Sequence, residues 1–357
     1  MSKKIAIIGA GACGLMLAVQ LEKYNIDYTL FNMGKVGRKI LASGNGKCNI
    51  SNAKFDEKAY HYNPLACKIV SDNKDALFSL LKELKIYTKV DNEGRMYPIS
   101  ESSQSVLNIL LKNINKEIIS LECNKISKKN GKYYINDSYG EYDYVVIATG
   151  SNAAFKKPYP TLSYLDSLHV EYNTFTPSLV GFKTNKKIKP ISGVRNKALV
   201  GLYKNDKLIH QEHGEVMFKD DGISGICVMN LSSYYANLNN KNNTYVKIDL
   251  SYNADYDDLE SVLAPKLYKY VLENNIDIHN FIINITGTYD MEFAQVAHGG
   301  IKLSEVNNNL SLKKHPNIFV GGEIVDFDAL CGGYNLMLAF TSSIQILRSI
   351  KNEISNK

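Results

Sequence analysis

The stretch at residues 4–25, KIAIIGAGACGLMLAVQLEKYN, decides the fold class. Its apolar run at residues 5–8 is typical of a strand buried on both faces of a parallel sheet. Leu15 and Val19 then follow helical spacing, so a helix is expected directly after the glycines. The run DYTLFN at residues 27–32 predicts a second strand. The chain therefore opens with a βαβ unit.

Three glycines stand between the predicted strand and helix in the pattern GxGxxG. Gly9 permits a tight turn, Gly11 lets a pyrophosphate approach the backbone, and Gly14 lets the helix and strand pack closely. The helix N-terminus adds unpaired N–H groups and the positive end of a dipole. Because the motif follows a strand and begins a helix, it predicts dinucleotide binding. The alternative is a glycine-rich turn that only connects the two elements.

The second predicted strand ends at Asn32, where an acidic residue is expected in a dinucleotide site. The amide carbonyl of Asn32 can accept a hydrogen bond from a ribose hydroxyl, but without charge assistance. We therefore expect this contact to be weaker than usual.

Size, charge and cysteine spacing limit the class of protein. A chain of 357 residues predicts about two domains. The net charge of +6 is mild, and no Lys/Arg block is dense enough for a nucleic-acid groove. Six scattered cysteines, none in a CxxC pair or a metal-ligand spacing, predict a reduced cytoplasmic protein without a metal site. Neither a signal peptide nor a membrane span is predicted.

The stretch GRKILASGNGKCNISN at residues 37–52 follows the second strand, where a simple nicotinamide dehydrogenase would soon return to helix. Gly44 and Gly46 bracket Asn45, so successive backbone N–H groups can turn toward one anionic or carbonyl-rich target. Such a loop suits a pyrophosphate, a ribityl chain and the edge of a flavin. Positive charge comes from Arg38, Lys39 and Lys47.

A second glycine cluster lies near the C-terminus, in NIFVGGEIVDFDALCGGYNLMLAF at residues 317–340. Glu323 and Asp326 follow a strand and can accept from ribityl hydroxyls. Gly332 and Gly333 allow the backbone to approach a flat ring, and the following helix N-terminus favours the reduced flavin anion. The alternative is a Gly-Gly turn capped by the next asparagine. Together with GxGxxG, this cluster favours FAD over a nicotinamide nucleotide alone.

The middle of the chain has a different residue pattern. From about Pro177, short strands alternate with turn residues, which predicts an antiparallel sheet or small barrel with a short helical piece. After Gly299 the α/β pattern returns. We therefore predict an α/β fold, with a Rossmann-like FAD-binding domain at residues 1–178 and 297–357. A β-rich substrate domain is inserted at residues 179–296.

The motifs resemble those of the BaiN-like, aminoacetone-oxidase-like family of bacterial FAD-dependent oxidoreductases. The matching stretches are IIGAGACGL, GRKILASGNGKCNISN, GRMYPIS, YVVIATG, HGEVMFKDDGISG and GGEIVDFDALCGGYNL, spread over nearly the whole chain. The resemblance implies FAD bound in a Rossmann-like fold of the two-dinucleotide-binding type, a β-barrel-like insert with a small helical piece, and a small organic substrate. Members of the family include an amine oxidase acting on aminoacetone and a reductase of unsaturated bile-acid intermediates.

The chain departs from the family pattern in and near the insert. Lys219-Asp220 stand where the family has Thr-His, and Ile226 stands where Pro is usual. Ala297-His298 replace a usual Thr-Ala pair, and the helical insert is shorter. Because these positions are expected to shape the substrate pocket, the substrate of a named member does not transfer.

The motifs and the resemblance together nominate a set of cofactor-binding residues. The set comprises Gly9, Gly11, Gly14, Asn32, Arg38, Lys39, Gly44, Asn45, Gly46, Lys47, Cys48, Asn49, Cys123, Thr149, Gly150, Gly322, Glu323, Asp326, Gly332, Gly333, Tyr334 and Asn335.

Catalytic groups are harder to assign, because the isoalloxazine ring itself performs the redox step. His298 and Tyr334 are candidate proton donors, and for each the alternative is a structural role. Cys48 and Cys331 are either a redox pair or small packing residues.

The sequence therefore predicts an FAD-dependent oxidoreductase, either a reductase or an oxidase, that acts on a small organic molecule. NADH or NADPH is a candidate transient electron donor, although no second GxGxxG marks a site for it. The alternatives are a dehydrogenase that uses only NAD(P), and a non-catalytic flavin-binding or RNA-associated protein. The substrate, the direction of electron flow and the oligomeric state stay open.

Overall fold

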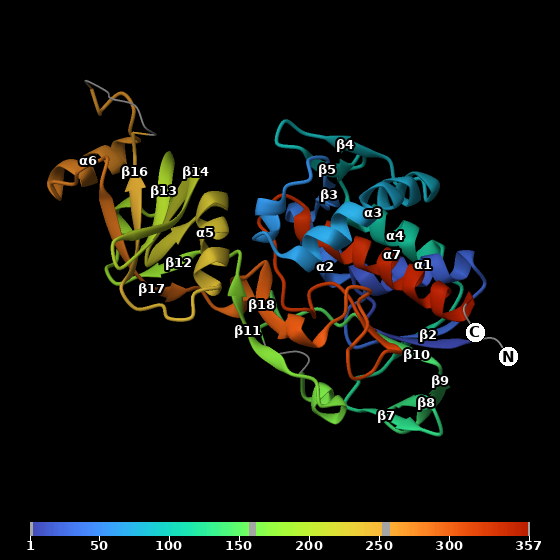
Figure 1. The fold of residues 1–357 in the computed structure, drawn as a ribbon. Helices are drawn as coiled ribbons and strands as arrows, with labels where there is room; N and C mark the ends of the chain where they lie inside the picture. The colour runs from blue at the N-terminus through green and yellow to red at the C-terminus, as the bar shows by residue number, and fades with distance from the viewer. Residues whose placement is uncertain (1–2, 157–161, 252–257, 356–357) are drawn as a thin grey trace. The chain divides into compact units, whose positions relative to one another are not determined.

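The computed structural model describes residues 3–156, 162–251 and 258–355, and the chain divides into two compact units (Figure 1). Unit 1 comprises Met1–Ser151, Pro158–Phe175 and Gly299–Lys357, and unit 2 comprises Asn152–Lys157 and Thr176–His298. The sequence pattern predicted domain boundaries at 178/179 and 296/297. In the structure the chain passes between the units nearby, at 175/176 and 298/299.

Unit 1 is built on a five-stranded parallel sheet in the order β19-β10-β1-β2-β6. The strands are β1 (Lys4–Ile8), β2 (Asp27–Asn32), β6 (Ile118–Ser120), β10 (Tyr144–Ile147) and β19 (Ile318–Val320). All residues of β10 and β19 are buried, as the continuous apolar runs predict. The expected Rossmann-like fold is confirmed.

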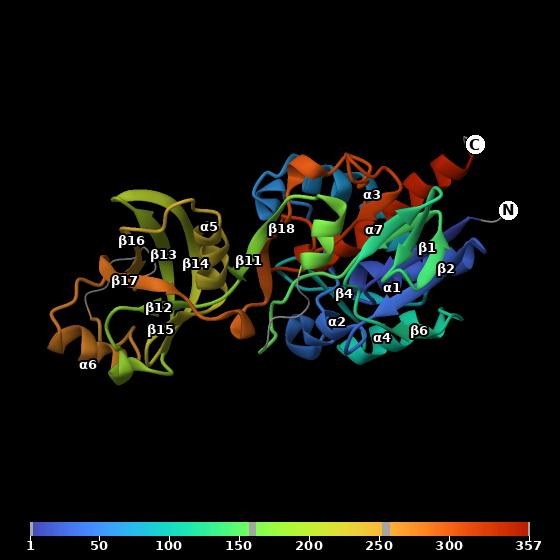
Figure 2. The same cartoon turned by 90° about the horizontal axis from the view of Figure 1, so that it is seen from below.

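Helices cover one face of this sheet. The helix α7 (Tyr334–Ser355) packs against both α1 (Ala12–Lys23) and α3 (Pro64–Glu83), while α4 (Ser103–Lys112) contacts α1 and the short α2 (Arg38–Ala42). Figures 1 and 2 show α1 and α7 side by side. The N-terminal and C-terminal segments of the chain are thus packed into one core.

Three further small sheets lie outside the barrel in the described residues. Two of them have three antiparallel strands: β3 (Ser51–Asn52), β5 (Arg95–Pro98) and β4 (Thr88–Val90) in one, and β7 (Ile126–Lys129), β8 (Lys132–Ile135) and β9 (Tyr139–Tyr142) in the other. The β7–β9 sheet contacts β1 and β10 on the face opposite α1 (Figure 1). The third pairs β11 (Tyr172–Ser178) with β18 (Val296–Ile301), and each of these strands contains a position at which the chain passes from one unit to the other.

Unit 2 is a closed six-stranded antiparallel barrel in the order β12-β15-β14-β13-β16-β17, which confirms the predicted barrel-like insert. The strands are β12 (Phe182–Thr184), β13 (Arg195–Lys204), β14 (Lys207–Lys219), β15 (Gly222–Ser224), β16 (Thr244–Asp249) and β17 (Phe281–Thr288). Alternate residues such as Val246, Ile248 and Phe218 fill the interior. The short predicted helical piece is α6 (Pro265–Glu273).

One helix of unit 2 was not expected from the sequence. The segment Ile226–Ala236 forms α5, which packs on β14. Most of its residues are buried, small polar ones such as Ser232 and Ser233 included. A helix buried on most sides lacks the apolar-polar alternation that reveals a surface helix, so its sequence gives little periodic signal.

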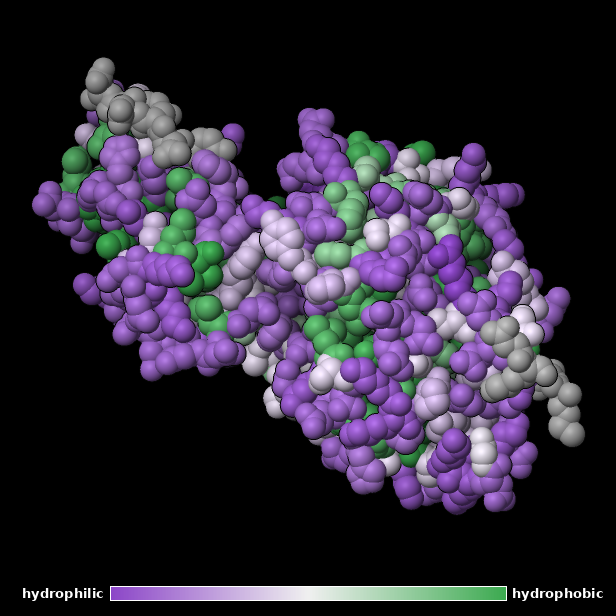
Figure 3. Space-filling view, viewed as in Figure 1, coloured by the Kyte–Doolittle hydropathy of each residue, from purple (hydrophilic) through white to green (hydrophobic). Residues whose placement is uncertain are grey.

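Within residues 3–156, 162–251 and 258–355, none of the helices combines the length and apolarity that crossing a membrane requires. Figure 3 shows a mainly hydrophilic face on which apolar side chains are dispersed.

Asp143, between β9 and β10, joins the start of β1 to the β7–β9 sheet. Its carboxylate accepts hydrogen bonds from the Lys4 backbone N–H at 3.0 Å, from Lys3 Nζ at 3.0 Å and from Lys132 Nζ at 2.9 Å. Although burial opposes ionisation, these donors lower the pKa of Asp143 to about 2. The ionised form is therefore favoured in the folded state.

We expect this carboxylate to make the stability of unit 1 depend on pH. Because the folded pKa lies below the unfolded value of about 3.9, the stabilisation is present above pH ~5 and disappears as the pH falls toward 2. The wild type should lose about 1 kcal/mol more unfolding free energy than Asp143→Asn between pH 6 and pH 3. Urea unfolding at several pH values measures this, and parallel pH profiles would contradict it.

Candidate functional site

The turn between β1 and α1 is fixed by close packing. A Cβ added at Gly9 would lie 2.4 Å from Ala148 O, and one added at Gly14 would lie 1.9 Å from Gly9 O. The Gly9 N–H donates to Phe31 O of β2 at 2.8 Å. Two of the three motif glycines are thus required by the approach of neighbouring backbone.

Gly11 differs because it faces open space. It is the N-cap of α1 with extended backbone, and a Cβ there would meet only Ala148 O, at 4.0 Å. Among the described residues, no side chain caps α1, and its first turn holds no acidic residue. A helix N-terminus beside unfilled space is a cradle suited to a phosphate.

Asn32 is tied to the same turn. Its Oδ1 accepts from the Ala10 N–H at 2.9 Å, and its Nδ2 donates to Gly34 O at 2.9 Å. The side chain therefore links the end of β2 to the glycine turn. Its contact with a ribose hydroxyl remains a prediction, for which the second lone pair of Oδ1 would serve.

The loop after α2 contains three consecutive residues in the left-handed region: Gly44 (φ 57°), Asn45 (φ 55°) and Gly46 (φ 84°). A Cβ on Gly44 would lie 2.7 Å from the Asn49 nitrogen, whereas Gly46 has no neighbour within 4 Å of that position. The loop is therefore packed on one side and open on the other. Lys47, which was expected to face the cofactor, forms an exposed ion pair with Glu101 at 2.8 Å.

The N-terminal and C-terminal glycine loops are in direct contact. In the orientation that satisfies both of its groups, the Asn49 amide donates to Ser51 O and accepts from the Gly333 N–H, each at 3.0 Å. Asn52 Nδ2 donates to Gly332 O at 3.0 Å. A Cβ on Gly333 would lie 2.3 Å from Ser51 O. Segments about 280 residues apart in sequence therefore form one structure, here called the loop junction (residues 49–52 and 332–333).

A second contact brings the glycine turn itself to the C-terminal strand. A Cβ on Gly321 would lie 2.8 Å from Cys13 Sγ, and one on Gly322 would lie 3.4 Å from Cys13 Cβ. The Gly321 N–H donates to Ile147 O of β10 at 3.1 Å. The carboxyl ends of β1, β10 and β19 thus meet at one edge of the sheet, where dinucleotides bind in such folds.

Lys39, Ser151 and Glu323 form a compact polar cluster at this edge. Lys39 Nζ donates to Ser151 Oγ at 2.7 Å and is paired with Glu323, and Ser151 Oγ donates to Glu323 Oε1 at 2.7 Å. Burial lowers the pKa of Lys39, and the Glu323 carboxylate partly opposes that shift. Sequence reasoning missed Ser151, although its place directly after the strand-ending ATG run was a usable signal.

The remaining C-terminal candidates hold loops in place. Asp326 accepts from the Gly299 N–H at 2.9 Å and from Asn173 Nδ2 at 2.6 Å. The Asn335 amide accepts from the Ala329 N–H at 2.9 Å and donates to Ala329 O at 2.6 Å. Asp326 and Asn335 therefore position backbone, and a direct contact of either with ribityl hydroxyls stays a prediction.

The two candidate proton donors differ in setting. The ring of Tyr334 meets Tyr60 edge to face at 5.6 Å, and burial raises the pKa of Tyr334. The backbone carbonyl of His298 accepts from Thr176 Oγ1 at 3.5 Å. A role of either side chain in proton transfer stays a prediction.

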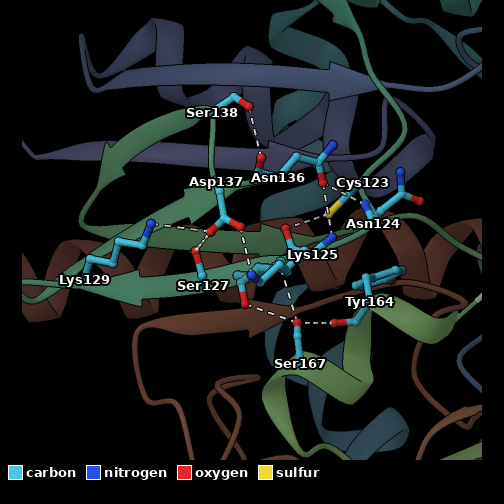
Figure 4. Close-up of polar contacts among 11 residues, drawn as sticks. Cys123, Asn124, Lys125, Ser127, Lys129, Asn136, Asp137, Ser138, Tyr164 and Ser167 are labelled. Carbon is cyan, nitrogen blue, oxygen red and sulfur yellow. Dashed lines mark hydrogen bonds and ion pairs between the residues drawn. The ribbon is translucent and has the colours of Figure 1, made fainter.

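Cys123 lies after β6 in the polar network of Figure 4. Asn136 Oδ1 accepts from the N–H groups of Asn124 and Lys125 at 2.8 and 3.1 Å, and the Cys123 thiol is 3.9 Å from Lys125 O. Burial raises the pKa of Cys123 to about 12. The buried thiol therefore stays protonated, and a contact of Cys123 with the cofactor stays a prediction.

Thr149 and Gly150 follow β10 at the same sheet edge as the glycine turn. Thr149 Oγ1 lies 3.0 Å from Tyr164 OH, and Gly150 has open space around its Cβ position.

Cys48 of the proposed redox pair is buried, and burial raises the pKa of its thiol to about 11. This setting favours packing over redox chemistry for Cys48.

The residues present fit a dinucleotide such as FAD. Gly11 forms a cradle that a Cβ would fill, the loop at residues 44–46 turns an open side outward, and Lys39 with Glu323 supplies charge at the same edge. The predicted residues lie in three segments of unit 1 that come together: the β1–α1 turn, the loop after β2 and the C-terminal loop. Lys47 points elsewhere, to Glu101.

Comparison with known proteins gives a family and a fold. The family model described as "HI0933-like protein Rossmann domain" matches residues 3–347. The 3-dehydro-bile acid delta(4,6)-reductase of Clostridium scindens is 25% identical over 95% of this chain and 97% of its own length. The ribosomal RNA dihydrouridine synthase of Haemophilus influenzae is 24% identical over 97% of this chain and 98% of its own length.

Among solved structures, the open conformation of a flavocytochrome c3 fumarate reductase superposes with a TM-score of 0.51 at 13% identity. The superposition covers 98% of this chain and 78% of the reductase chain. This likeness supports the fold alone.

Proposed function

We propose, on the premise that this chain belongs to the HI0933-like Rossmann family, that it is an FAD-dependent reductase of an electron-poor carbon–carbon double bond. Family membership confirms the resemblance drawn from the motifs. Two contacts support the proposal: the loop junction joins the loop after β2 to the Gly-Gly loop, and the approach of Gly321 to Cys13 joins the helix that starts at the phosphate cradle to the C-terminal strand.

The type of reaction is suggested by the relatives. The names of the two curated enzymes both describe saturation of a double bond, in a bile-acid skeleton and in uridine. In each case we read the acceptor as a carbon–carbon double bond conjugated with a carbonyl group. We extend this class to the present chain without assigning a particular molecule, since the insert departs from the family pattern at Lys219 and Asp220.

When bound, FAD supplies hydride transfer, and the residues of this chain supply position and charge. The N-terminus of α1 at Gly11 would hold the diphosphate, and the loop at residues 44–46 would line the middle of the cofactor. Gly332 and Gly333 would let backbone approach the ring, with the N-terminus of α7 behind them. Because that helix end is positive, it would stabilise negative charge on the neighbouring pyrimidine edge.

The test begins with the visible spectrum of the purified protein. We expect visible flavin absorption and release of FAD on heating, as from a non-covalent flavoprotein with a Kd of about 1 μM or tighter. After anaerobic reduction by NADH or NADPH, a 3-oxo-4,6-diene steroid and unmodified ribosomal RNA are added separately. Reoxidation by either probe supports the proposal.

Two outcomes would count against it. A colourless protein that cannot be reconstituted with FAD would exclude a flavoenzyme. Reoxidation by oxygen alone, with hydrogen peroxide formed and an amine able to reduce the flavin, would indicate an oxidase instead.

A further inference from the structure

We infer that Lys39 is a positioning residue which, with Ser151, holds Glu323 as an ionised acceptor at the cofactor edge of the sheet, and that Lys39 is not a phosphate ligand. The inference rests on the proposed function, because FAD binding is one of its readouts. It also narrows the prediction made from sequence, in which Lys39 supplies positive charge to a loop suited to a pyrophosphate, a ribityl chain and the edge of a flavin.

The three side chains form a closed triangle of contacts. Lys39 donates to both partners, and Ser151 Oγ accepts from Lys39 while it donates to Glu323. The hydroxyl of Ser151 thus uses both of its roles within the cluster. Each side chain is held by at least two contacts, so the cluster has little freedom to turn Lys39 toward a separate anion.

The cluster joins three loops that each follow a strand of the parallel sheet. Lys39 is in α2 after β2, Ser151 follows β10, and Glu323 follows β19. These segments are 112 to 284 residues apart along the chain. The triangle therefore fixes the relative positions of the loops that line the proposed cofactor site.

Burial makes the pair mutually dependent. The side chains of Lys39 and Glu323 are only 27% and 16% exposed. Removing one partner of a poorly hydrated ion pair leaves the other charge buried without compensation, which costs free energy. Removing both partners avoids this cost. The ion pair of Lys47, in the same motif, is more exposed: the side chains of Lys47 and Glu101 are 54% and 38% exposed.

The experiment compares FAD and ADP as probes of the apo-protein. ADP carries the pyrophosphate and adenosine but lacks the ribityl chain and the ring. In Lys39→Met we expect the Kd for FAD to rise about 30-fold and that for ADP to change less than about twofold, because the diphosphate cradle is intact. The control Lys68→Met/Asp72→Asn removes an exposed ion pair of α3 and should leave both values within about twofold.

A double-variant comparison tests the coupling. If Glu323→Gln alone raises the Kd for FAD about 10-fold, independent effects predict about 300-fold for Lys39→Met/Glu323→Gln. We expect the double variant to be no worse than about 30-fold, since the uncompensated charge is gone. The thermal midpoint of each apo-protein should show the same non-additivity without any cofactor.

The outcomes separate the possible failures. An equal loss of ADP and FAD affinity in Lys39→Met would make Lys39 a phosphate ligand and overturn the inference, as would additive effects in the double variant. If ADP binds too weakly to measure, the double variant decides. If Lys39→Met does not fold, Ser151→Ala replaces it, with an expected loss of FAD affinity of about fivefold and unchanged ADP affinity. Failure of the wild type to bind FAD would instead refute the proposed function.

Discussion

Gly11→Ala is expected to abolish stoichiometric FAD binding while leaving the apo-protein folded. Gly11 has a backbone conformation that alanine adopts readily, and its Cβ would contact only Ala148 O, at 4.0 Å. The added methyl would therefore occupy the phosphate cradle without disturbing the protein. Overpacking of this kind costs about 3 kcal/mol, which corresponds to about a 100-fold rise in the Kd for FAD.

Gly14→Ala is the matched control, because the same methyl group is added three residues away. Its Cβ would lie 1.9 Å from Gly9 O, so β1 and α1 would have to move apart. We expect it to lower both FAD affinity and the thermal midpoint of the apo-protein. Isothermal titration with FAD and apo-protein melting curves distinguish the two variants. A large loss of apo stability in Gly11→Ala would contradict the open cradle.

Gly333→Ala is expected to break the loop junction. Gly333 has φ +97°, which an alanine adopts only with strain, and its Cβ would lie 2.3 Å from Ser51 O. Strain and overlap together should cost about 3–4 kcal/mol, and the Gly333 hydrogen bond to Asn49 would be lost. FAD affinity should fall by about 100-fold or more.

The measurement for Gly333→Ala is FAD content after purification, together with limited proteolysis near residues 49–52. Increased cleavage there is expected because the partner loop no longer covers this segment. Gly131→Ala, at the turn between β7 and β8, is the control, since it also has positive φ but meets no atom within 4 Å. If both variants kept full FAD content, the junction would not be needed for the cofactor.

The local part of the site could be predicted from sequence because it depends on short-range physics. A buried apolar strand followed by GxGxxG and a helix leaves little choice of geometry, and Gly9 and Gly14 take the expected positions. The barrel was predicted as well, because its strands alternate with turn residues. In contrast, α5 escaped prediction because most of its residues are buried, so it shows no clear apolar stripe.

The long-range part could not be predicted, because it depends on partners far apart in the chain. Lys39 and Lys47 look equivalent in the motif, yet one is paired with Glu323 and the other with surface Glu101. Likewise, the side chain of Asn32 reaches back to the Ala10 N–H, and that of Asp326 reaches to Gly299. Composition and spacing give each residue's chemistry but do not identify its partner.

The late position of β19 and α7 has a consequence for biosynthesis. Domains usually fold from the N-terminal end as the chain leaves the ribosome. Here β10 lacks one of its two neighbouring strands, and α1 and α3 lack the helix they share, until residues 318–355 have been translated. The barrel of unit 2, by contrast, is encoded without interruption between residues 182 and 288. The nascent polypeptide can therefore finish its inserted unit before the parallel sheet and the helix layer of unit 1 are complete.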